Sequence, residues 1–341
     1  MAPRLKDIAK AADVSPSTVS IAMHYKNGVS KEVRQRILNI AADMGYKNIP
    51  QKPFFFSKNN TIRLLKIATH GHIVNDRHNA FISECLEGIE TETKSRNLKL
   101  EVSFFNHVPM EEIIASQRNA EVGGFIVLGT ELSSHDLAYF SDIDKPLVFI
   151  DTYFPHSLFD CVDMDNMDGA FQAVQHFYNA GHRNIGLIKS MYKTRNFTMR
   201  EFGFREVMEY FSLPVDEKNI ISLDPTYDGS VQDMGAYLDR TGAPPPTAFF
   251  CMSDIISYGI IKALKDHNYN VPEDVSVIGF DDLPSSNFSD PPLTTIKVST
   301  GEMGRRALEK LASRIMGQAS QFTENTLISG KLMIRKSVRQ L

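Results

Sequence analysis

The hydrophobic pattern changes its period near residue 61, and this change constrains the fold more than any other feature. Beyond it, short β-branched or apolar runs alternate with amphipathic segments such as Phe81–Arg96 and Asp168–Ala180. The runs that resemble buried strands are Leu64–Thr69, Lys99–Phe104, Gly124–Leu128, Pro146–Ile150, Asn184–Ile188, Ala248–Met252, Val275–Phe280 and, late in the chain, Lys331–Lys336. This alternation predicts an α/β fold with parallel sheets covered by helices. So many strands favour two similar lobes, with ligands at the carboxyl ends of the strands.

Residues 5–46 follow a helical period instead. Ser15 and Pro16 form a helix start, because a hydroxyl caps free N–H groups and proline tolerates the first turn. We therefore expect three short helices in this part. The second runs from Pro16 to about residue 24, and the third is capped by Ser30 and stopped by Gly45.

Charge separates the same two parts. Residues 1–60 hold ten lysines and arginines against four acidic residues, and the remainder holds 27 against 37. A basic head on an acidic body indicates that the head meets a polyanion; the alternative is a solvated basic tail. No apolar stretch has the length of a signal peptide or membrane span, and Cys85, Cys161 and Cys251 show neither disulfide nor zinc spacing. We expect a cytoplasmic protein without membrane contact.

Several motifs resemble the lactose-repressor/galactose-repressor family in the family's own order. The first is "LKDIAKAADVSPSTVSIAMHYKNGVSKEVRQRILNIAADMGY" at Leu5–Tyr46. The others are Val148–Phe154, Val162–Ile188, Arg200–Met208, Phe249–Asp254 and Val275–Ser299, so the resemblance spans nearly the whole chain. It implies an all-α helix-turn-helix headpiece at 1–47, a linker at 48–60 and a two-lobed periplasmic-binding-protein-like sensor at 61–341. The expected lobes are 61–160 with 292–324, and 161–291 with 325–341.

The resemblance places the second helix in the DNA major groove. It assigns base contacts to Pro16, Ser17 and Ile21, and phosphate contacts to Ser15, Thr18, Asn27 and Ser30. Relatives often carry arginine at position 21. Isoleucine cannot bind guanine in a bidentate manner but can pack on a thymine methyl, unless Ile21 faces partly inward.

The linker departs further from the family, in which it forms a short hinge helix that wedges a leucine into the minor groove. Here Pro50 and Pro53 disturb a regular helix, and three phenylalanines begin at Phe54. We hypothesise that Phe55 or Phe56 serves as the wedge. The alternative is that the phenylalanines pack on the sensor.

For the sensor, the resemblance assigns effector contacts to Asp151, Arg200 and Asp281. Carboxylates accept hydrogen bonds from vicinal hydroxyls and a guanidinium donates a planar fork, so this set suits a polyhydroxylated ligand. Ser253 stands where relatives often have asparagine. The chain lacks tryptophan, so Phe81, Tyr153 and Tyr227 are candidates for an aromatic platform, with core packing as the alternative.

Other polar residues are expected to have structural roles. Asp165, Asn166 and Asp168 are expected to cap a helix start, and His182 and Arg183 to stabilise a helix end. The cluster of His70, His72 and His78 suggests either a metal site or, as we favour, a polar rim of the ligand cleft.

These patterns together predict a DNA-binding transcriptional regulator, more often a repressor among relatives, whose effector is a sugar or sugar derivative. It requires no cofactor or metal, binds a pseudo-palindromic operator as a homodimer, and lacks the nucleophile, phosphate-loop and dinucleotide motifs of enzymes. A purine-type effector is the alternative within this class. An exported solute-binding protein of the same fold is disfavoured by the basic helical head.

Overall fold

The computed structural model describes residues 3–23, 28–46, 60–75 and 78–341. The chain divides into two compact units, residues 1–55 and residues 56–341. The first unit contains three helices in its described part: α1 (Leu5–Ala11), α2 (Pro16–Met23) and α3 (Lys31–Asp43). The unit corresponds to the helical headpiece predicted from the sequence.

The three helices of the headpiece close around one small apolar cluster. Its buried members are Ile8, Ala9, Ala12, Val19, Ala22, Met23, Ile37 and Ala41. Ser30 caps α3 by accepting a hydrogen bond from the Val33 amide at 3.3 Å, and Gly45 follows α3 with a left-handed φ of +70°. The guanidinium of Arg34 donates to the carbonyl oxygens of Ile21 and Ala22 at 3.1 and 2.9 Å, which joins α3 to the end of α2.

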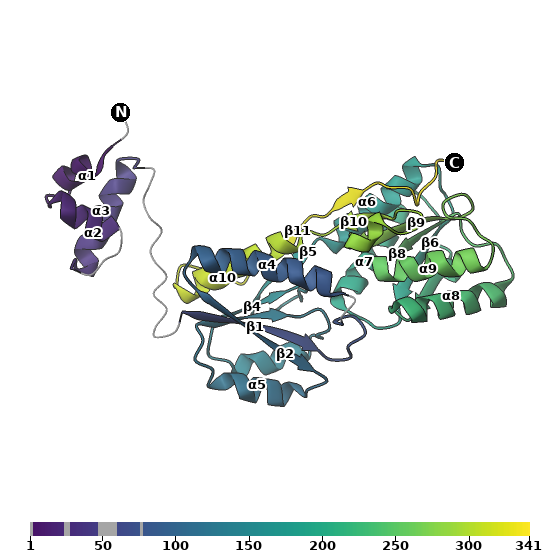
Figure 1. Ribbon diagram of the computed structural model, residues 1–341, viewed down its shortest axis with the longest axis horizontal. Coiled ribbons are helices and arrows are strands. Elements are labelled where there is room, and N and C mark those ends of the chain that lie inside the picture. The colour runs from purple at the N-terminus through teal and green to yellow at the C-terminus, as the bar shows by residue number, and fades with distance from the viewer. Residues whose placement is uncertain (1–2, 24–27, 47–59, 76–77) are drawn as a thin grey trace. The chain divides into compact units, whose positions relative to one another are not determined.

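The second unit is built from two six-stranded sheets, one in each lobe (Figure 1). In lobe one the order is β11-β5-β4-β3-β1-β2, and all paired strands are parallel. The bounds are β1 (Thr61–Ala68), β2 (Lys99–Asn106), β3 (Gly124–Leu128), β4 (Leu147–Ile150), β5 (Asp160–Met164) and β11 (Asn325–Ile328). The helices of this lobe are α4 (Asn79–Ser95), α5 (Met110–Arg118), η2 (Asp136–Asp142) and α10 (Thr300–Ile315).

Lobe two repeats this plan with the order β12-β10-β9-β8-β6-β7, in which only β12 runs antiparallel to its neighbour among the described strands. The strands are β6 (Ile185–Ser190), β7 (Ile220–Leu223), β8 (Ala248–Cys251), β9 (Ser276–Asp281), β10 (Thr294–Lys297) and β12 (Lys331–Met333). The helices are α6 (Asn166–Asn179), α7 (Arg195–Tyr210), η3 (Glu217–Asn219), α8 (Tyr227–Thr241), α9 (Asp254–Asp266) and η4 (Pro284–Asn287). Helices α6 and α7 pack together, as do α8 and α9, and the pairs cover the two faces of the sheet.

Four strands were not predicted from the sequence: β5, β7, β10 and β11. Each has only four or five residues, and polar side chains such as Asp163 in β5 and Thr295 in β10 interrupt the apolar run. Their neighbours in the sheet rather than their own hydrophobicity define them as strands.

The chain crosses between the lobes three times, and each crossing follows a strand that the predicted boundaries assign to the other lobe. β5 belongs to lobe one, although lobe two was expected to begin at residue 161. β10 belongs to lobe two, although a return to lobe one was expected at 292, and β11 belongs to lobe one despite an expected return to lobe two at 325. The expected boundaries are corrected accordingly, because a strand completes its sheet before the chain leaves the lobe.

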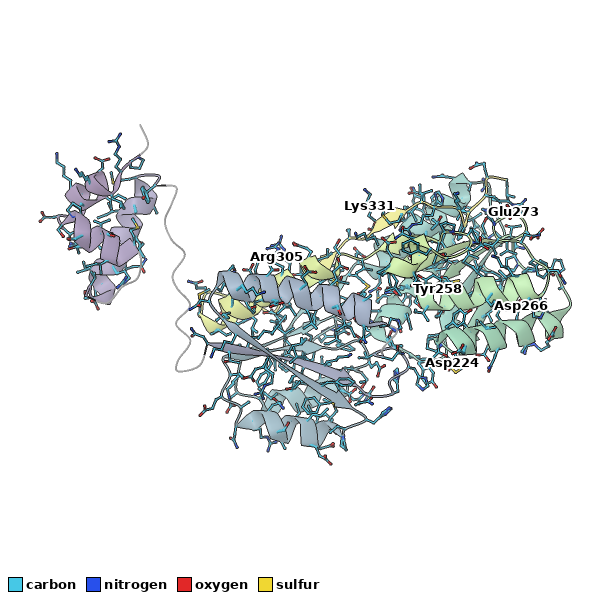
Figure 2. All side chains as sticks on the ribbon, viewed as in Figure 1. Asp224, Tyr258, Asp266, Glu273, Arg305 and Lys331 are labelled. Atoms are coloured by element: carbon cyan, nitrogen blue, oxygen red, sulfur yellow. The ribbon has the colours of Figure 1, made fainter. Side chains whose placement is uncertain are left out.

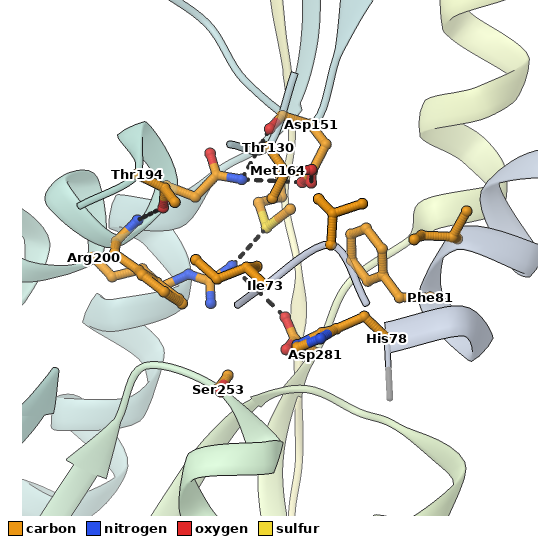
Figure 3. A pocket seen from close by; sticks show the side chains of 14 residues that line it. Ile73, His78, Phe81, Thr130, Asp151, Met164, Thr194, Arg200, Ser253 and Asp281 are labelled. Carbon is orange, nitrogen blue, oxygen red and sulfur yellow. Dashed lines mark hydrogen bonds and ion pairs between the residues drawn. The ribbon is translucent and has the colours of Figure 1, made fainter. Parts of the chain in front are cut away.

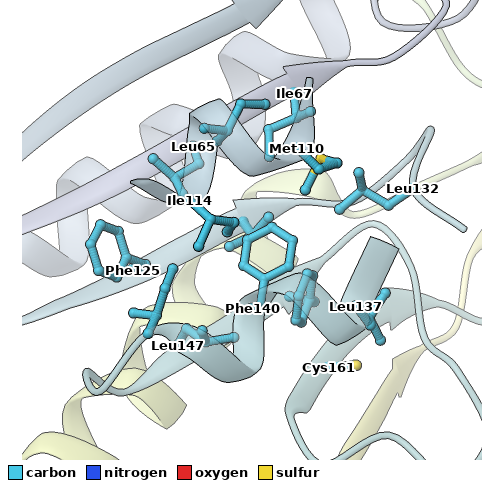
Figure 4. Packing of buried hydrophobic residues seen from close by; sticks show 14 of the residues in the cluster. Leu65, Ile67, Met110, Ile114, Phe125, Leu132, Leu137, Phe140, Leu147 and Cys161 are labelled. Atoms are coloured by element: carbon cyan, nitrogen blue, oxygen red, sulfur yellow. The ribbon is translucent and has the colours of Figure 1, made fainter. Parts of the chain in front are cut away.

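Each sheet buries apolar residues against its helices. In lobe one, Phe125, Phe140 and Phe149 are fully buried in a cluster between the sheet and the α5–η2 side (Figure 4). On the other side, α4 and α10 approach so closely that a Cβ on Gly88 would lie 2.0 Å from the Gly301 carbonyl oxygen. Glycine is required there because any side chain would separate the two helices.

Charged side chains lie on the outer faces of both lobes, for example Arg305 on α10 and Asp266 on α9 (Figure 2). Arg305 forms ion pairs with Glu302 and Glu309 on the same helix. Within the described residues, none of the helices has both the length and the apolar character needed to span a membrane.

Candidate functional site

The N-terminal end of α2 presents a row of hydroxyl groups to solvent. Ser15, Pro16 and Ser17 are exposed, and Thr18 is half-buried. The Ser15 hydroxyl accepts a hydrogen bond from the Thr18 amide at 3.1 Å and lies 2.7 and 2.8 Å from the hydroxyls of Ser17 and Thr18. This end of α2 is therefore a compact polar surface that also carries the positive end of a short helix.

Ile21 is half-buried and does not belong to the apolar cluster of the headpiece. Ser30, the other predicted phosphate ligand in the described residues, is exposed and caps α3. The remaining predicted DNA-contacting residues, Asn27, Phe55 and Phe56, lie outside the described residues.

A narrow cavity lies between the two lobes at the carboxyl ends of their strands (Figure 3). Its free volume is about 40 Å³, room for roughly three water molecules. It is lined by Ile73, Val74, His78, Phe81, Ile82, Thr130, Asp151, Met164, Thr194, Asn196, Phe197, Arg200, Ser253 and Asp281. The structure thus brings five of the seven predicted effector residues together: Phe81, Asp151, Arg200, Ser253 and Asp281.

Arg200, on α7, is the electrostatic centre of the cavity and is only 3% exposed. Its Nε donates to Asn166 Oδ1 at 2.8 Å, Nη1 donates to the Met252 carbonyl oxygen, and Nη2 lies 3.0 Å from Met164 Sδ. Nη2 also lies 3.6 Å from Asp281 Oδ1. The guanidinium stacks 3.6 Å from the ring centroid of Phe280, so packing and hydrogen bonds fix its orientation.

Asp151 follows β4 in lobe one and is tied to lobe two. Asn196 of α7 donates to both the Asp151 carbonyl oxygen and Oδ1, at 3.1 and 3.0 Å, and the Thr130 hydroxyl donates to Oδ2. Asp151 has a left-handed φ of +63°, and Asp281 at the end of β9 has +116°. Non-glycine residues in this region carry strain that is often found at functional sites.

Ser253 and Asp254 organise the lobe-two wall. The Ser253 hydroxyl caps α9 by accepting from the Ile256 amide at 3.3 Å. The fully buried Asp254 carboxylate accepts from the Leu283 amide at 2.8 Å and from the hydroxyls of Ser286 and Thr295 at 2.6 and 2.5 Å. Asp254 therefore anchors the loop that follows Asp281.

Burial controls the titration of the cavity carboxylates. It raises the pKa of Asp151 to about 6, against the opposing effects of Thr130, Arg200 and Asn196, and raises the pKa of Asp254 to about 7. The pKa values of Asp163 and Asp281 are raised by the same cause, and burial lowers the pKa of Arg200. Burial, helped by Arg200, lowers the pKa of His78 to about 4, so this imidazole is neutral at pH 7.

Two predicted platform residues lie elsewhere. Tyr153 packs against the apolar cluster of lobe one, with the Arg195 guanidinium 4.8 Å from its ring centroid. Tyr227 opens α8 and lines a separate surface groove with Tyr258 and Phe288. Their assignment to the cavity is corrected: Tyr153 packs against the apolar cluster of its own lobe, and Tyr227 lines a different groove. Of the predicted aromatics, only Phe81 lines the cavity.

The three histidines after β1 separate. His78 lines the cavity, whereas His70 and His72 stack on Tyr192 of lobe two, with ring centroids 5.1 and 3.9 Å apart. Among the described residues, no group of three or more histidine, cysteine, aspartate or glutamate side chains is arranged to hold a metal ion. His70 and His72 therefore connect lobe one to lobe two through Tyr192.

Glu131 fixes the loop that carries these histidines and was not singled out from the sequence. Its buried carboxylate accepts hydrogen bonds from four backbone amides, those of His70, Gly71, Ile73 and Val74, at 2.7–3.0 Å. These bonds lower its pKa despite burial. A glutamate that reaches back across about 60 residues leaves no local sequence signal.

The residues expected to cap α6 have different roles in the structure. Asp165 caps the helix by accepting from the Asp168 amide at 3.0 Å. Asn166 instead is buried and connects Arg200 to Asn196, to whose Oδ1 it donates at 3.2 Å. Its expected role as a simple cap is therefore too narrow. Arg183 donates to the Tyr178 carbonyl oxygen at 2.8 Å near the end of α6, which fits the expected role at the helix end.

Known proteins resemble the chain over its full length. The description "Bacterial regulatory proteins, lacI family" matches residues 4–48, and "Periplasmic binding protein-like domain" matches residues 174–338. The chain is 31% identical over 342 residues to the HTH-type transcriptional repressor CytR of Escherichia coli, covering 100% of this chain and 97% of that protein. It is 29% identical over 348 residues to the HTH-type transcriptional repressor PurR of Haemophilus influenzae, covering 99% of each.

Two solved structures share the fold. A transcriptional regulator CelR–cellobiose complex matches with a TM-score of 0.73 at 25% identity, over 98% of this chain and 99% of that one. The lac repressor dimer bound to operator and the anti-inducer ONPF matches with a TM-score of 0.73 at 22% identity, over 99% and 100%. These matches confirm the family predicted from the motifs: the chain belongs to the lacI family of bacterial regulatory proteins.

Proposed function

We propose that this protein is a transcriptional repressor whose affinity for a pseudo-palindromic operator is controlled by a sugar or sugar derivative bound between the lobes. The relatives CytR and PurR are named as transcriptional repressors, and the CelR structure contains cellobiose. α2 inserts into the major groove, with Pro16, Ser17 and Ile21 facing bases and Ser15, Thr18 and Ser30 facing phosphates. Asn27 and one phenylalanine of the linker, Phe55 or Phe56, complete this interface.

The observation that carries the effector role is the convergence of Asp151, Arg200 and Asp281 on one cavity. They come from three elements of two lobes and are separated by tens of residues in sequence, yet all three line it. Ser253 adds a hydroxyl and Phe81 an apolar face. A cavity of about 40 Å³ is far smaller than an ordinary ligand site of roughly 300–1,000 Å³, so binding requires the lobes to move apart and close again.

Lobe movement supplies the coupling to DNA. Two headpieces must meet half-sites at a fixed spacing, and a change in lobe arrangement alters that spacing in a two-fold symmetric homodimer. The effect of the ligand on operator affinity equals the effect of the operator on ligand affinity.

A purine-type effector is the second candidate. The apolar side chains of the cavity, among them Phe81, Phe197 and Ile73, support it because a planar base can pack on them.

The function is tested with the full chain. Operator sequences are selected from a random duplex library, and the affinity for the winning site is measured by fluorescence anisotropy with and without sugars, sugar phosphates, nucleosides and nucleobases. We expect a selected palindrome and one compound class that shifts its affinity. Asp281→Asn should remove the shift but not operator binding, whereas Asp266→Asn, on the outer face of α9, should leave both unchanged. Selection of no DNA sequence contradicts the regulator role, and a shift by nucleobases alone contradicts the sugar assignment.

A further inference from the structure

The cavity and its immediate surroundings contain more buried carboxyl groups than cationic groups. Asp151 and Asp281 line the cavity, and Asp163 and Asp254 are 0% exposed behind it. All four act electrostatically on Arg200, which is the one cation among the described residues that line the cavity. Arg195, which does not line the cavity, also acts on Asp163, so two guanidinium groups stand against four carboxyl groups.

The guanidinium is also already engaged by the protein. Its Nε, Nη1 and Nη2 contact Asn166, Met252 and Met164, one face is covered by Phe280, and Nη2 points toward Asp281. An anion-binding arginine offers its fork of N–H groups to the ligand. Here the fork is occupied by Asn166, Met252 and Met164, and Nη2 faces Asp281, so few of its N–H groups are available to a phosphate or carboxylate of a ligand.

The opposite side of the cavity is apolar. Phe81 lies across the cavity from Arg200 in Figure 3. The buried apolar side chains that the β1–α4 segment of lobe one contributes are Ile73, Val74 and Ile82, joined by the half-buried Phe81. Phe197 lies on the Arg200 side, with the guanidinium 5.5 Å from its ring centroid. A ligand that spans the cavity meets hydrogen-bond acceptors at one end and hydrocarbon at the other.

Building on the effector role proposed above, we propose that the effector is an uncharged conjugate, a polyhydroxylated ring joined to an apolar or aromatic group as in a glycoside or a nucleoside. Its hydroxyls donate to Asp151 and Asp281, and its apolar group packs on Phe81 and its neighbours. Phosphorylated and carboxylated sugars are disfavoured, because each would place a further negative charge among four carboxyl groups, and Arg200, the one cation among the described residues that line the cavity, is already engaged by the protein.

The test is calorimetric titration of the full chain with two matched series. One is phenyl β-glucoside, glucose and glucose 6-phosphate; the other is adenosine, ribose, adenine and adenosine 5′-monophosphate. We expect the neutral conjugate of one series to bind about tenfold or more tightly than its bare sugar and its free ring. Its phosphorylated counterpart should bind about a hundredfold or more weakly. The series that binds identifies the source of the apolar group.

A charge-removing variant sharpens this test. Asp163→Asn keeps the shape of a side chain that lies behind the cavity, so it should narrow the preference for neutral over phosphorylated ligand by about tenfold. Asp266→Asn removes the same charge from the outer face of α9 and should leave that preference unchanged. A melting temperature near that of the wild type confirms that Asp163→Asn has folded.

Three results overturn the proposal: a phosphorylated ligand that binds as tightly as its neutral parent, a bare sugar that binds as tightly as its conjugate, or no binding in either series. Asp76 and Arg77 lie outside the described residues, and tight phosphate binding that is lost in Arg77→Ala would locate the contradicting cation. Binding of a neutral conjugate without any change in operator affinity supports the ligand class and contradicts the proposed repressor function instead.

Discussion

Arg200 illustrates how one residue holds a buried site together. Removing its charge would leave Asp151, Asp163 and Asp281 without their shared partner in a region where the carboxyl groups are almost inaccessible to water. Breaking a buried ion pair on one side typically costs about 3–5 kcal/mol. We expect Arg200→Leu to lower the free energy of unfolding by that amount in urea titrations.

Arg205 provides the matched control on the same helix. It pairs with Glu201 and Glu217, but its side chain is 37% exposed, and exposed pairs contribute about 0–1 kcal/mol. Arg205→Leu should therefore change stability by less than about 1 kcal/mol. Equal losses in both variants would contradict the larger contribution of the buried charge of Arg200.

Asp151 makes the stability of the unliganded protein depend on pH. Its pKa is raised from 3.8 to about 6, so the folded state binds the proton more tightly than the unfolded state. The resulting stabilisation is complete below about pH 4 and is lost as the pH rises through about 6, a change of roughly 3 kcal/mol.

This loss is measured as the difference in unfolding free energy between the wild type and Asp151→Asn. The variant stays neutral, so the wild type should lose stability relative to it between pH 4 and pH 6. A difference that is constant across this range contradicts the raised pKa. Other titrating groups cancel in the comparison, because both proteins carry them.

At the scale of elements, the loop between β1 and α4 depends on a single carboxylate. Glu131→Gln replaces an acceptor of four backbone amides by a group that also carries donors. Hydrogen exchange of His70, Gly71, Ile73 and Val74 should accelerate about tenfold or more. Glu112→Gln, on the exposed face of α5, should leave these amides protected; acceleration in both variants would point to a global effect.

Helix α2 carries a prediction about DNA sequence preference. Ile21 lies one turn beyond Ser17 and outside the headpiece core, so a longer side chain fits there without disturbing packing. Ile21→Arg should shift the selected operator toward guanine at one position in each half-site, with a discrimination of about 1–3 kcal/mol. An unchanged selected sequence would mean that position 21 does not face the bases.

The elements also show what the sequence could predict. Strands buried on both faces, such as β3 and β8, are continuous apolar runs and were predicted within a residue or two. β5 was missed because Asp160 and Asp163 stand where apolar residues were expected, and those aspartates contact Arg314 and Asn166 rather than core. Short strands that are defined by their neighbours in the sheet have too few apolar residues in a row to be predicted from the sequence.

The residues that line the cavity were also predicted only in part. Asp151, Arg200 and Asp281 were predicted from the resemblance to the family, and the position of the two aspartates after apolar strands agreed with it. Ser253 was predicted from the motif around it. Thr130, Asn196 and Ile73 also line the cavity but lie in segments without a distinguishing pattern. Tyr153 and Tyr227 were wrongly placed there because an aromatic residue next to a strand end can turn either into the cleft or away from it.

For the molecule as a whole, the proposed homodimer makes a prediction about lobe two. Phe288 is 88% exposed beside Tyr258, Tyr227 and Lys262 in a groove between α9 and η4 (Figure 2 labels Tyr258). An exposed aromatic next to a groove is a frequent anchor in protein interfaces. We expect Phe288→Asp to sediment as a monomer and to lose affinity for a two-half-site operator.

Phe322 offers the matched comparison, because it is 69% exposed in the segment between α10 and β11 of lobe one. Phe322→Asp should leave both the sedimentation coefficient and operator affinity unchanged. If Phe288→Asp also remains dimeric, the subunits associate through another face.

The three crossings between the lobes have a consequence for how the protein is made. Lobe one begins with β1 at Thr61 but receives α10 and β11 only after lobe two has been synthesised as far as β10. At about 5–20 residues per second, the ribosome needs roughly 10–30 s to pass from β5 to β11. During that interval the apolar face of α4 that α10 later covers is open on the nascent chain. We expect chaperones to bind this incomplete lobe one on the nascent chain. Both lobes should reach their final packing almost together, near the end of translation.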